Sequence, residues 1–200
     1  MERQLVMRIR RLFSNAHRSL LIGVTASVAI AWLILALGAT AVAYNNSENP
    51  SCTWTNGTTV QVNWAWGASI NTSGYWANGY RLASDAWTQA GTKVHVGYSS
   101  SAASQANVYS YANGLDGEND YWCHAPDIWN GMAYTYSYGN LYYNGDSSGY
   151  YTRIKQVTAH EFGHGLALGH STDSTAVMCV SSCSDTPRSD DIAGLNSLYP

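Results

Sequence analysis

Hydrophobic and polar positions alternate in two stretches of the first half of the chain. Across residues 58–66, Val60, Val62 and Trp64 alternate with polar or small residues. Residues 92–98 repeat this pattern. A period of two is typical of β-strands with one buried face, so both stretches are predicted to be strands.

Three other stretches carry apolar residues at helical spacing. A helix is expected over residues 75–90, and Gly91 should end it. A second is expected over residues 153–168 and a third over residues 189–199, where Ser189 or Asp190 should cap the start and the acidic residues suit its positive end. Their apolar positions are Trp76, Tyr80, Ala83 and Trp87; Ile154, Val157, Ala159, Phe162 and Leu166; and Ile192, Leu195 and Leu198.

The segment between the first two helices is harder to assign. Residues 99–107 are small and polar and are expected to form a loop, followed by short strands at residues 108–112, 131–137 and 140–144. The order strand, helix, strands, helix predicts one α+β domain over residues 52–200.

The N-terminus reads as an export segment. Five arginines precede an apolar run over residues 20–43, which ends in Ala-Val-Ala, the small-x-small pattern of a cleavage site. Residues 1–43 are therefore expected to be a signal peptide and residues 44–51 a short linker. The run is also long enough to span a bilayer, so an uncleaved anchor is the alternative. Cleavage would leave a secreted, extracellular protein without stable membrane association.

The net charge of the chain limits the kind of binding partner, and its cysteine content bears on the cellular compartment. After residue 43, five basic residues stand against twelve acidic ones, a net charge of −7, which argues against a nucleic-acid partner. The chain has four cysteines, which allow three pairings. Export favours disulfides, and we expect Cys52–Cys123 and Cys179–Cys183.

An acidic stretch at residues 116–120 leaves two interpretations open. Asp116, Glu118 and Asp120 alternate oxygen ligands in a manner that suits Ca²⁺. The EF-hand pattern fails, because Tyr121 stands where the glycine belongs. The alternative is a solvated acidic loop.

The strongest chemical signal is His160-Glu161-Phe162-Gly163-His164. On a helix, His160 and His164 project from the same face and can reach one Zn²⁺ ion. Glu161 lies beside them and suits a general base that takes a proton from a zinc-bound water.

A third ligand must come from beyond the helix. His170 lies six positions after His164, so the chain has to turn between them, and Gly165 and Gly169 make a turn plausible. The chain contains no glutamate after Glu161, which excludes a site completed by a downstream glutamate.

The spacing of these histidines, Met178 eight residues after His170, and the segment over residues 189–199 together resemble the matrixins, a family of metzincin zinc endopeptidases. The resemblance is specific over residues 150–200. The family has a glycine where this chain has Ala167, which leaves the turn geometry open. A left-handed conformation at a non-glycine residue costs about 1–2 kcal/mol.

The resemblance implies a fold and a function. It implies a twisted, mostly parallel sheet of about five strands with an active-site helix and a C-terminal helix. It also implies zinc bound by His160, His164 and His170, Glu161 as the catalytic base, and a turn at Met178 beneath the metal. The chain would be a monomeric enzyme that hydrolyses peptide or protein substrates.

Two further expectations concern the substrate. It should lie extended along an edge strand, at residues 131–137, and the loop from Cys179 to Cys183 should wall the pocket for the side chain after the scissile bond. The alternative function is a non-catalytic module that binds glycan or peptide through its many Trp and Tyr side chains.

Overall fold

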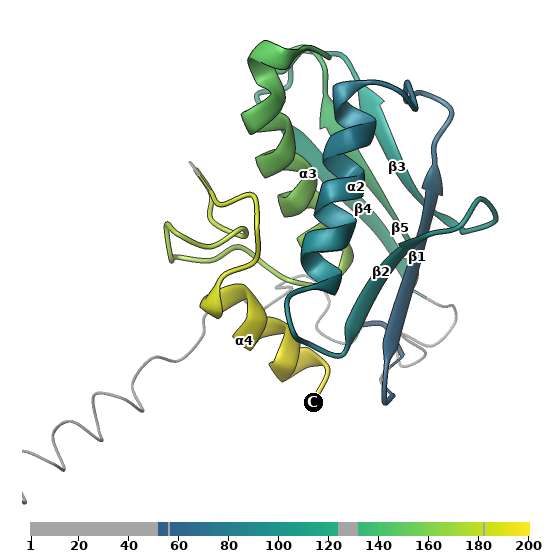
Figure 1. The fold of residues 1–200 in the computed structure, drawn as a ribbon, viewed down its shortest axis with the longest axis vertical. Helices are drawn as coiled ribbons and strands as arrows, with labels where there is room; N and C mark the ends of the chain where they lie inside the picture. The colour runs from purple at the N-terminus through teal and green to yellow at the C-terminus, as the bar shows by residue number, and fades with distance from the viewer. Residues whose placement is uncertain (1–51, 56, 124–131, 182) are drawn as a thin grey trace, which may run out of the picture. The chain divides into compact units, whose positions relative to one another are not determined.

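The computed structural model describes residues 52–55, 57–123, 132–181 and 183–200. The predicted leader at residues 1–43 and the linker at residues 44–51 lie outside these ranges. Figure 1 shows one sheet with two long helices packed across it and a shorter C-terminal helix beside them. The elements are β1 (Val60–Trp66), α2 (Tyr75–Thr88), β2 (Val94–Tyr98), β3 (Ser104–Tyr109), β4 (Gly117–Cys123), β5 (Met132–Asn140), the 3-10 turn η2 (Ser148–Tyr150), α3 (Tyr151–Gly165) and α4 (Ser189–Leu198).

The sheet has the strand order β2-β1-β3-β5-β4. Four strands run parallel, and β4 pairs antiparallel with β5 at one edge. The predicted α+β fold with a mostly parallel five-stranded sheet is therefore confirmed. Within the described residues, no helix combines the length and apolar character needed to cross a bilayer.

Both long helices lie side by side on the same face of the sheet. The core between them and the sheet is largely aromatic, with Trp76, Tyr80 and Trp87 buried. Their polar atoms are satisfied: the Trp87 indole donates to the Ala159 carbonyl, for example, at 2.9 Å. This is what large amphipathic rings require when they are buried. The core therefore fixes α3, the site-bearing helix, directly against α2.

Close approach in this core depends on glycine at two positions. A Cβ at Gly79 in α2 would lie 2.8 Å from Ile154 of α3, and a Cβ at Gly139 in β5 would lie 2.0 Å from the Trp76 ring. α2 therefore packs so closely against α3 and against β5 that a side chain at either glycine would not fit.

Several predicted boundaries in the middle of the chain are wrong. Residues 104–107, expected in a loop, form the start of β3, and residues 117–123 form β4. Residues 132–140 form one strand, β5, where two strands were expected at residues 131–137 and 140–144. Residues 141–144 form a turn. β3 is buried on both faces in the sheet interior, so it lacks the alternation that marks a half-buried strand.

Two disulfides tie the described chain together. Cys52 pairs with Cys123, which joins the N-terminal end of the domain to the end of β4, and Cys179 pairs with Cys183 in the loop before α4. These are the pairings favoured from the sequence.

Candidate metal centre

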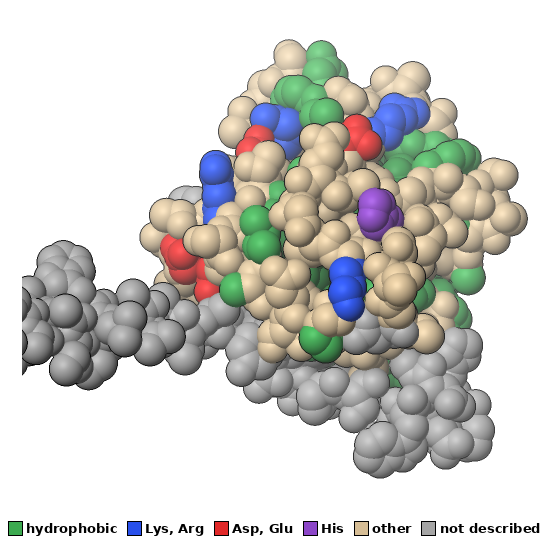
Figure 2. Space-filling model, turned by 60° about the horizontal axis from the view of Figure 1, so that its bottom comes forward, with side chains coloured by type: hydrophobic (Ala, Val, Ile, Leu, Met, Phe, Trp, Pro, Cys, Tyr) green, Lys and Arg blue, Asp and Glu red, His purple; other side chains and the backbone are tan. Residues whose placement is uncertain are grey.

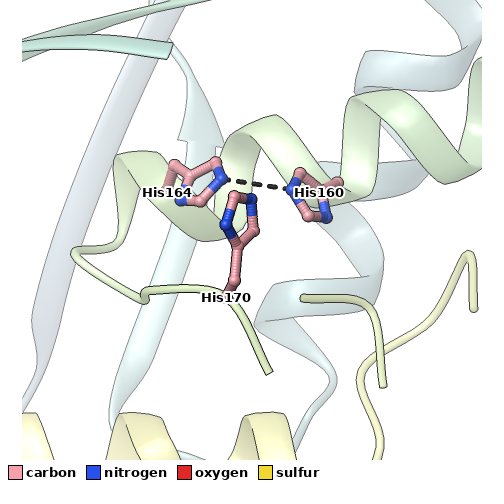
Figure 3. Close-up of side chains that lie close together, drawn as sticks. All are labelled: His160, His164 and His170. Carbon is pink, nitrogen blue, oxygen red and sulfur yellow. Dashed lines mark hydrogen bonds between the residues drawn. The ribbon is translucent and has the colours of Figure 1, made fainter. Parts of the chain in front are cut away.

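The helix α3 places His160 and His164 on one face. Their Nε2 atoms lie 3.1 Å apart, one turn from each other along the helix. Figure 3 shows both rings directed toward the same point, with His170 reaching that point from the segment after the helix.

The turn that brings His170 back begins at the end of α3. Ala167 adopts a left-handed conformation with φ of 70°, and the backbone N–H groups of Leu166 and Leu168 donate to carbonyls of the last helical turn. These bonds cap the helix and reverse the chain. Ala167 therefore adopts the backbone conformation expected for the glycine that it replaces, at a cost of about 1–2 kcal/mol.

The three histidines converge. The ligand atoms of His160, His164 and His170 all lie within 4.8 Å of one another, and among the described residues they form the one group of histidine, cysteine or acidic side chains arranged to hold a metal ion. His160 and His164 are partly buried, whereas His170 is exposed.

Backbone carbonyls set the orientation of two rings. The Nδ1 atom of His160 donates to the carbonyl of Val177 at 2.8 Å, and that of His164 donates to the carbonyl of Leu168 at 2.9 Å. This arrangement leaves each Nε2 without its proton, as a metal ligand must be. Burial lowers the pKa of His160 to about 4 and that of His164 to about 3, so both rings are neutral near pH 7.

These observations test whether zinc fits. Two nitrogens at about 2.1 Å from Zn²⁺ in tetrahedral geometry lie roughly 3.4 Å apart, close to the spacing of the two helical Nε2 atoms. Neutral imidazoles fixed through Nδ1 are the ligands of three-histidine zinc sites, so the residues present fit this metal.

Met178 lies beneath the histidine-bearing helix and is fully buried. A Cβ at Gly163 would lie 2.2 Å from its sulfur, so the helix and the methionine turn are in close contact. Met178 therefore packs directly against the helix that carries His160 and His164.

Asp191 holds that turn in place, and sequence reasoning missed it. Its buried carboxylate accepts hydrogen bonds from the backbone N–H groups of Val177 (2.9 Å), Met178 (3.1 Å) and Arg188 (2.8 Å). α4 begins at Ser189 with Arg188 as its N-cap residue, so the expected cap by Ser189 or Asp190 is wrong. The sequence pattern indicates only that Asp191 is one of the acidic residues that favour the start of this helix. It gives no sign that the side chain contacts the turn.

Glu161 lies at the wall of a cleft with a volume of about 720 Å³, which the three histidines also line. Its side chain is buried beside β4: a Cβ at Gly117 would lie 2.7 Å from its Oε1 atom. Burial first, and then the charges of Glu118 and Asp116, raise the pKa of Glu161 well above its ordinary value. A carboxylate with raised proton affinity next to a candidate metal site can act as a general base.

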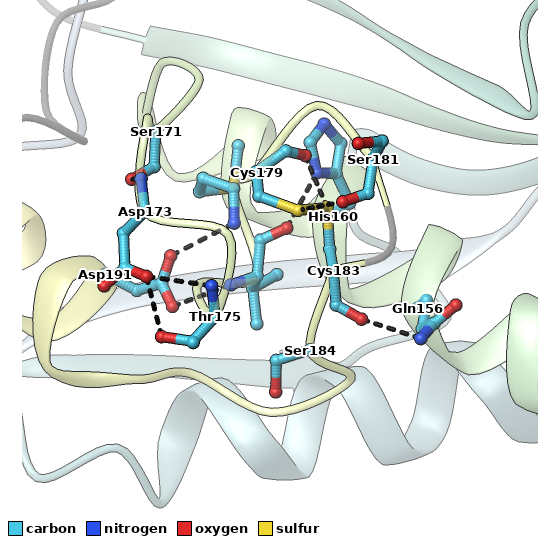
Figure 4. Close-up of a disulfide and its surroundings, with 12 residues drawn as sticks. Gln156, His160, Ser171, Asp173, Thr175, Cys179, Ser181, Cys183, Ser184 and Asp191 are labelled. Atoms are coloured by element: carbon cyan, nitrogen blue, oxygen red, sulfur yellow. Dashed lines mark hydrogen bonds between the residues drawn. A yellow bond between two sulfur atoms is a disulfide. The ribbon is translucent and has the colours of Figure 1, made fainter.

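β4 and the disulfide loop both line the cleft. Gly117, Glu118 and Asn119 come from β4, and Cys179, Val180 and Cys183 come from the loop. Gln156 of α3 donates to the Cys183 carbonyl at 2.7 Å, which fixes this loop to the helix (Figure 4). The expectation that residues 131–137 form the edge strand is wrong, because β5 lies inside the sheet and β4 forms the edge.

The acidic residues considered for calcium do not gather around a common point. Asp116 forms an ion pair with Arg153 and accepts a hydrogen bond from Asn144 at 2.6 Å. Arg153, assisted by Asn144, holds the pKa of Asp116 below its ordinary value against the effect of burial. Glu118 and Asp120 extend from β4, so the described structure gives no support to a calcium site.

Comparisons with known proteins agree with this geometry. The family model described as matrixin matches residues 68–200. A 48-residue stretch is 50% identical to human matrix metalloproteinase-27, and a 97-residue stretch is 38% identical to the hatching enzyme of Paracentrotus lividus. These stretches cover 22% and 46% of this chain, but 9% and 16% of the relatives' own length. The match over most of the domain, together with the histidine cluster and the five-stranded sheet, shows that the chain belongs to the matrixin family.

Proposed function

We propose that the protein is a secreted zinc-dependent endopeptidase. The observation that carries the proposal is the convergence of His160, His164 and His170 in a cleft that also holds Glu161. Zinc held by the three histidines would lower the pKa of a bound water toward about 7 and polarise a substrate carbonyl.

The residues of the chain divide the remaining work. Glu161 accepts the proton of the attacking water and passes it to the leaving amine, a role that its buried position in the cleft beside the three histidines suits. Val177 and Leu168 hold two of the imidazoles through their carbonyls, so these rings do not reorient during the reaction.

The substrate is proposed to lie extended along β4. An edge strand presents unpaired backbone groups that can bond to a peptide as an added strand, and residues of β4 line the cleft. The disulfide loop on the other wall would then contact the side chain that follows the scissile bond.

Two features support export. Both disulfides are of the kind that persist in oxidising compartments, and the basic and apolar segment at residues 1–43 has the pattern of a signal peptide. N-terminal sequencing of the exported product would test cleavage after Ala43.

The experiment that tests the catalytic proposal compares the wild type with Glu161→Gln. Both proteins should bind one zinc per chain by metal analysis, and only the wild type should cleave a mixed peptide library, with chelator-sensitive activity. A wild-type protein that binds zinc but cleaves nothing would instead favour the non-catalytic binding module.

A further inference from the structure

The face of the sheet opposite the two long helices carries a continuous row of aromatic rings. We call it the aromatic face, and it consists of Tyr109, Tyr111, Trp122, Tyr134, Tyr136 and Tyr138. Adjacent rings have centroids between 4.4 and 6.4 Å apart. Tyr111 and Trp122 are 50% and 38% exposed, and the other four are half-buried.

Strand pairing places acidic groups among these rings. In the register of β4 with β5, Glu118 lies opposite Tyr138, Asp120 opposite Tyr136, and Trp122 opposite Tyr134. Residues directly opposite each other on one face of an antiparallel pair are in contact range. The carboxylates are therefore adjacent to the rings.

The strands that carry the aromatic face have no basic side chains of their own. β3, β4 and β5 contain no lysine or arginine, and Glu118 and Asp120 form no ion pair with any described residue. Burial raises the pKa of Tyr138, and the carboxylates of Asp120 and Glu118 raise it further, so their negative potential extends over the neighbouring rings. Figure 2 shows another side of the molecule, where Lys and Arg side chains are present among the Asp and Glu side chains.

Ring stacking between strands explains why these residues stabilise the sheet, at about 0.5–1.5 kcal/mol per pair. It does not explain the carboxylates, because a stabilising surface pair would place a basic residue opposite an acidic one. Electron-rich ring faces beside carboxylates that form no ion pair with a described residue make a surface complementary to ammonium and guanidinium groups.

We propose that the aromatic face is an exosite that binds a lysine- and arginine-rich segment of the protein substrate. The inference rests on the proposed endopeptidase function. Glu118 links the two sites: it lines the cleft, and its carboxylate accepts a hydrogen bond from the hydroxyl of Tyr111 on the aromatic face. A substrate lying along β4 can therefore contact the exosite with a segment just outside the cleft.

The test measures binding separately from catalysis. The zinc-loaded Glu161→Gln protein is titrated into a short fluorescent Arg-Gly peptide, with Glu-Gly and Ser-Gly peptides for comparison. Only the basic peptide should bind, and its affinity should fall at least about 3-fold as the salt rises from about 0.05 to 0.3 M.

Substitutions then locate the binding surface. Asp120→Asn and Tyr136→Leu should each weaken binding about 3- to 10-fold, while Tyr136→Phe, which keeps the ring, should retain it. Asp85→Asn, which removes the same charge from the exposed face of α2, is the matched control and should bind as the parent does. Melting curves check that each variant is folded.

Three outcomes would overturn the proposal: no binding of the basic peptide, equal losses in Asp120→Asn and Asp85→Asn, or preferential binding of a neutral oligosaccharide such as chitohexaose. The last would identify the face as a glycan site. None of these depends on whether the wild-type enzyme cleaves peptides, so failure of the exosite and failure of the proposed activity are distinguishable.

Discussion

Asp191 connects the C-terminal helix to the candidate metal site through a short chain of hydrogen bonds. Its carboxylate accepts the N–H of Val177, and the carbonyl of Val177 accepts the Nδ1 proton of His160. Replacing Asp191 by alanine should therefore reduce both the stability of the domain and the affinity of the site for zinc.

The structure sets the size of the expected effect. Asp191→Ala leaves the buried N–H groups of Val177 and Met178, and that of Arg188, without their acceptor. Each unsatisfied buried donor costs about 1–3 kcal/mol, partly recovered by water, so a total loss of about 3–5 kcal/mol is expected. In a domain of about 150 residues this lowers Tm by about 10 °C or more. Asp191→Asn keeps the shape and one acceptor oxygen, so about 1–3 kcal/mol is expected.

The assay has two parts. Thermal unfolding of the chelated protein measures the structural loss, and competition with a zinc indicator measures metal affinity, which should fall about 10- to 100-fold because the support of His160 is weakened. Asp85→Asn, on the exposed face of α2, serves as the control. An Asp191→Ala protein that melts within about 2 °C of the wild type, or binds zinc equally well, would refute this reasoning.

Three further predictions follow from single positions. Ala167→Gly removes the left-handed strain at φ of 70° and should raise the free energy of unfolding by up to about 1 kcal/mol in urea titrations; a loss of stability would contradict the strain argument. Gly139→Ala brings a Cβ to within 2.0 Å of the Trp76 ring and should lower the free energy of unfolding by about 1–3 kcal/mol or more. Gly145→Ala, whose Cβ would lie 3.5 Å from Tyr150, is the control and should be nearly neutral. Similar urea midpoints for the two variants would argue against the close packing. Replacing Cys179 and Cys183 together by serine loosens one wall of the cleft and should broaden cleavage preference in a peptide-library digest, while an unchanged preference would remove the loop from substrate selection.

Sequence patterns were sufficient for the parts of the fold with local periodicity. β1, α2 and α3 were predicted close to their observed bounds, because half-buried strands and amphipathic helices repeat their apolar positions every two or three to four residues. The same rule failed for β3, where both faces are buried, and for β4, an edge strand composed mainly of polar residues. Neither strand has an apolar period that local reasoning can detect.

The candidate site also has parts that the sequence predicts and parts that only the structure reveals. The sequence by itself determined that His160 and His164 share a helix face with Glu161 beside them, since their separation along the chain fixes their direction once a helix forms. It also supplied His170 as a candidate third ligand, because glycines between it and His164 allow a turn, and Met178 through its resemblance to a family pattern. The tertiary structure decided that Ala167 turns the chain back, that Asp191 holds the methionine turn, and that β4 rather than β5 borders the cleft. These features depend on contacts between residues far apart in the chain, and no local spacing encodes which distant groups will meet.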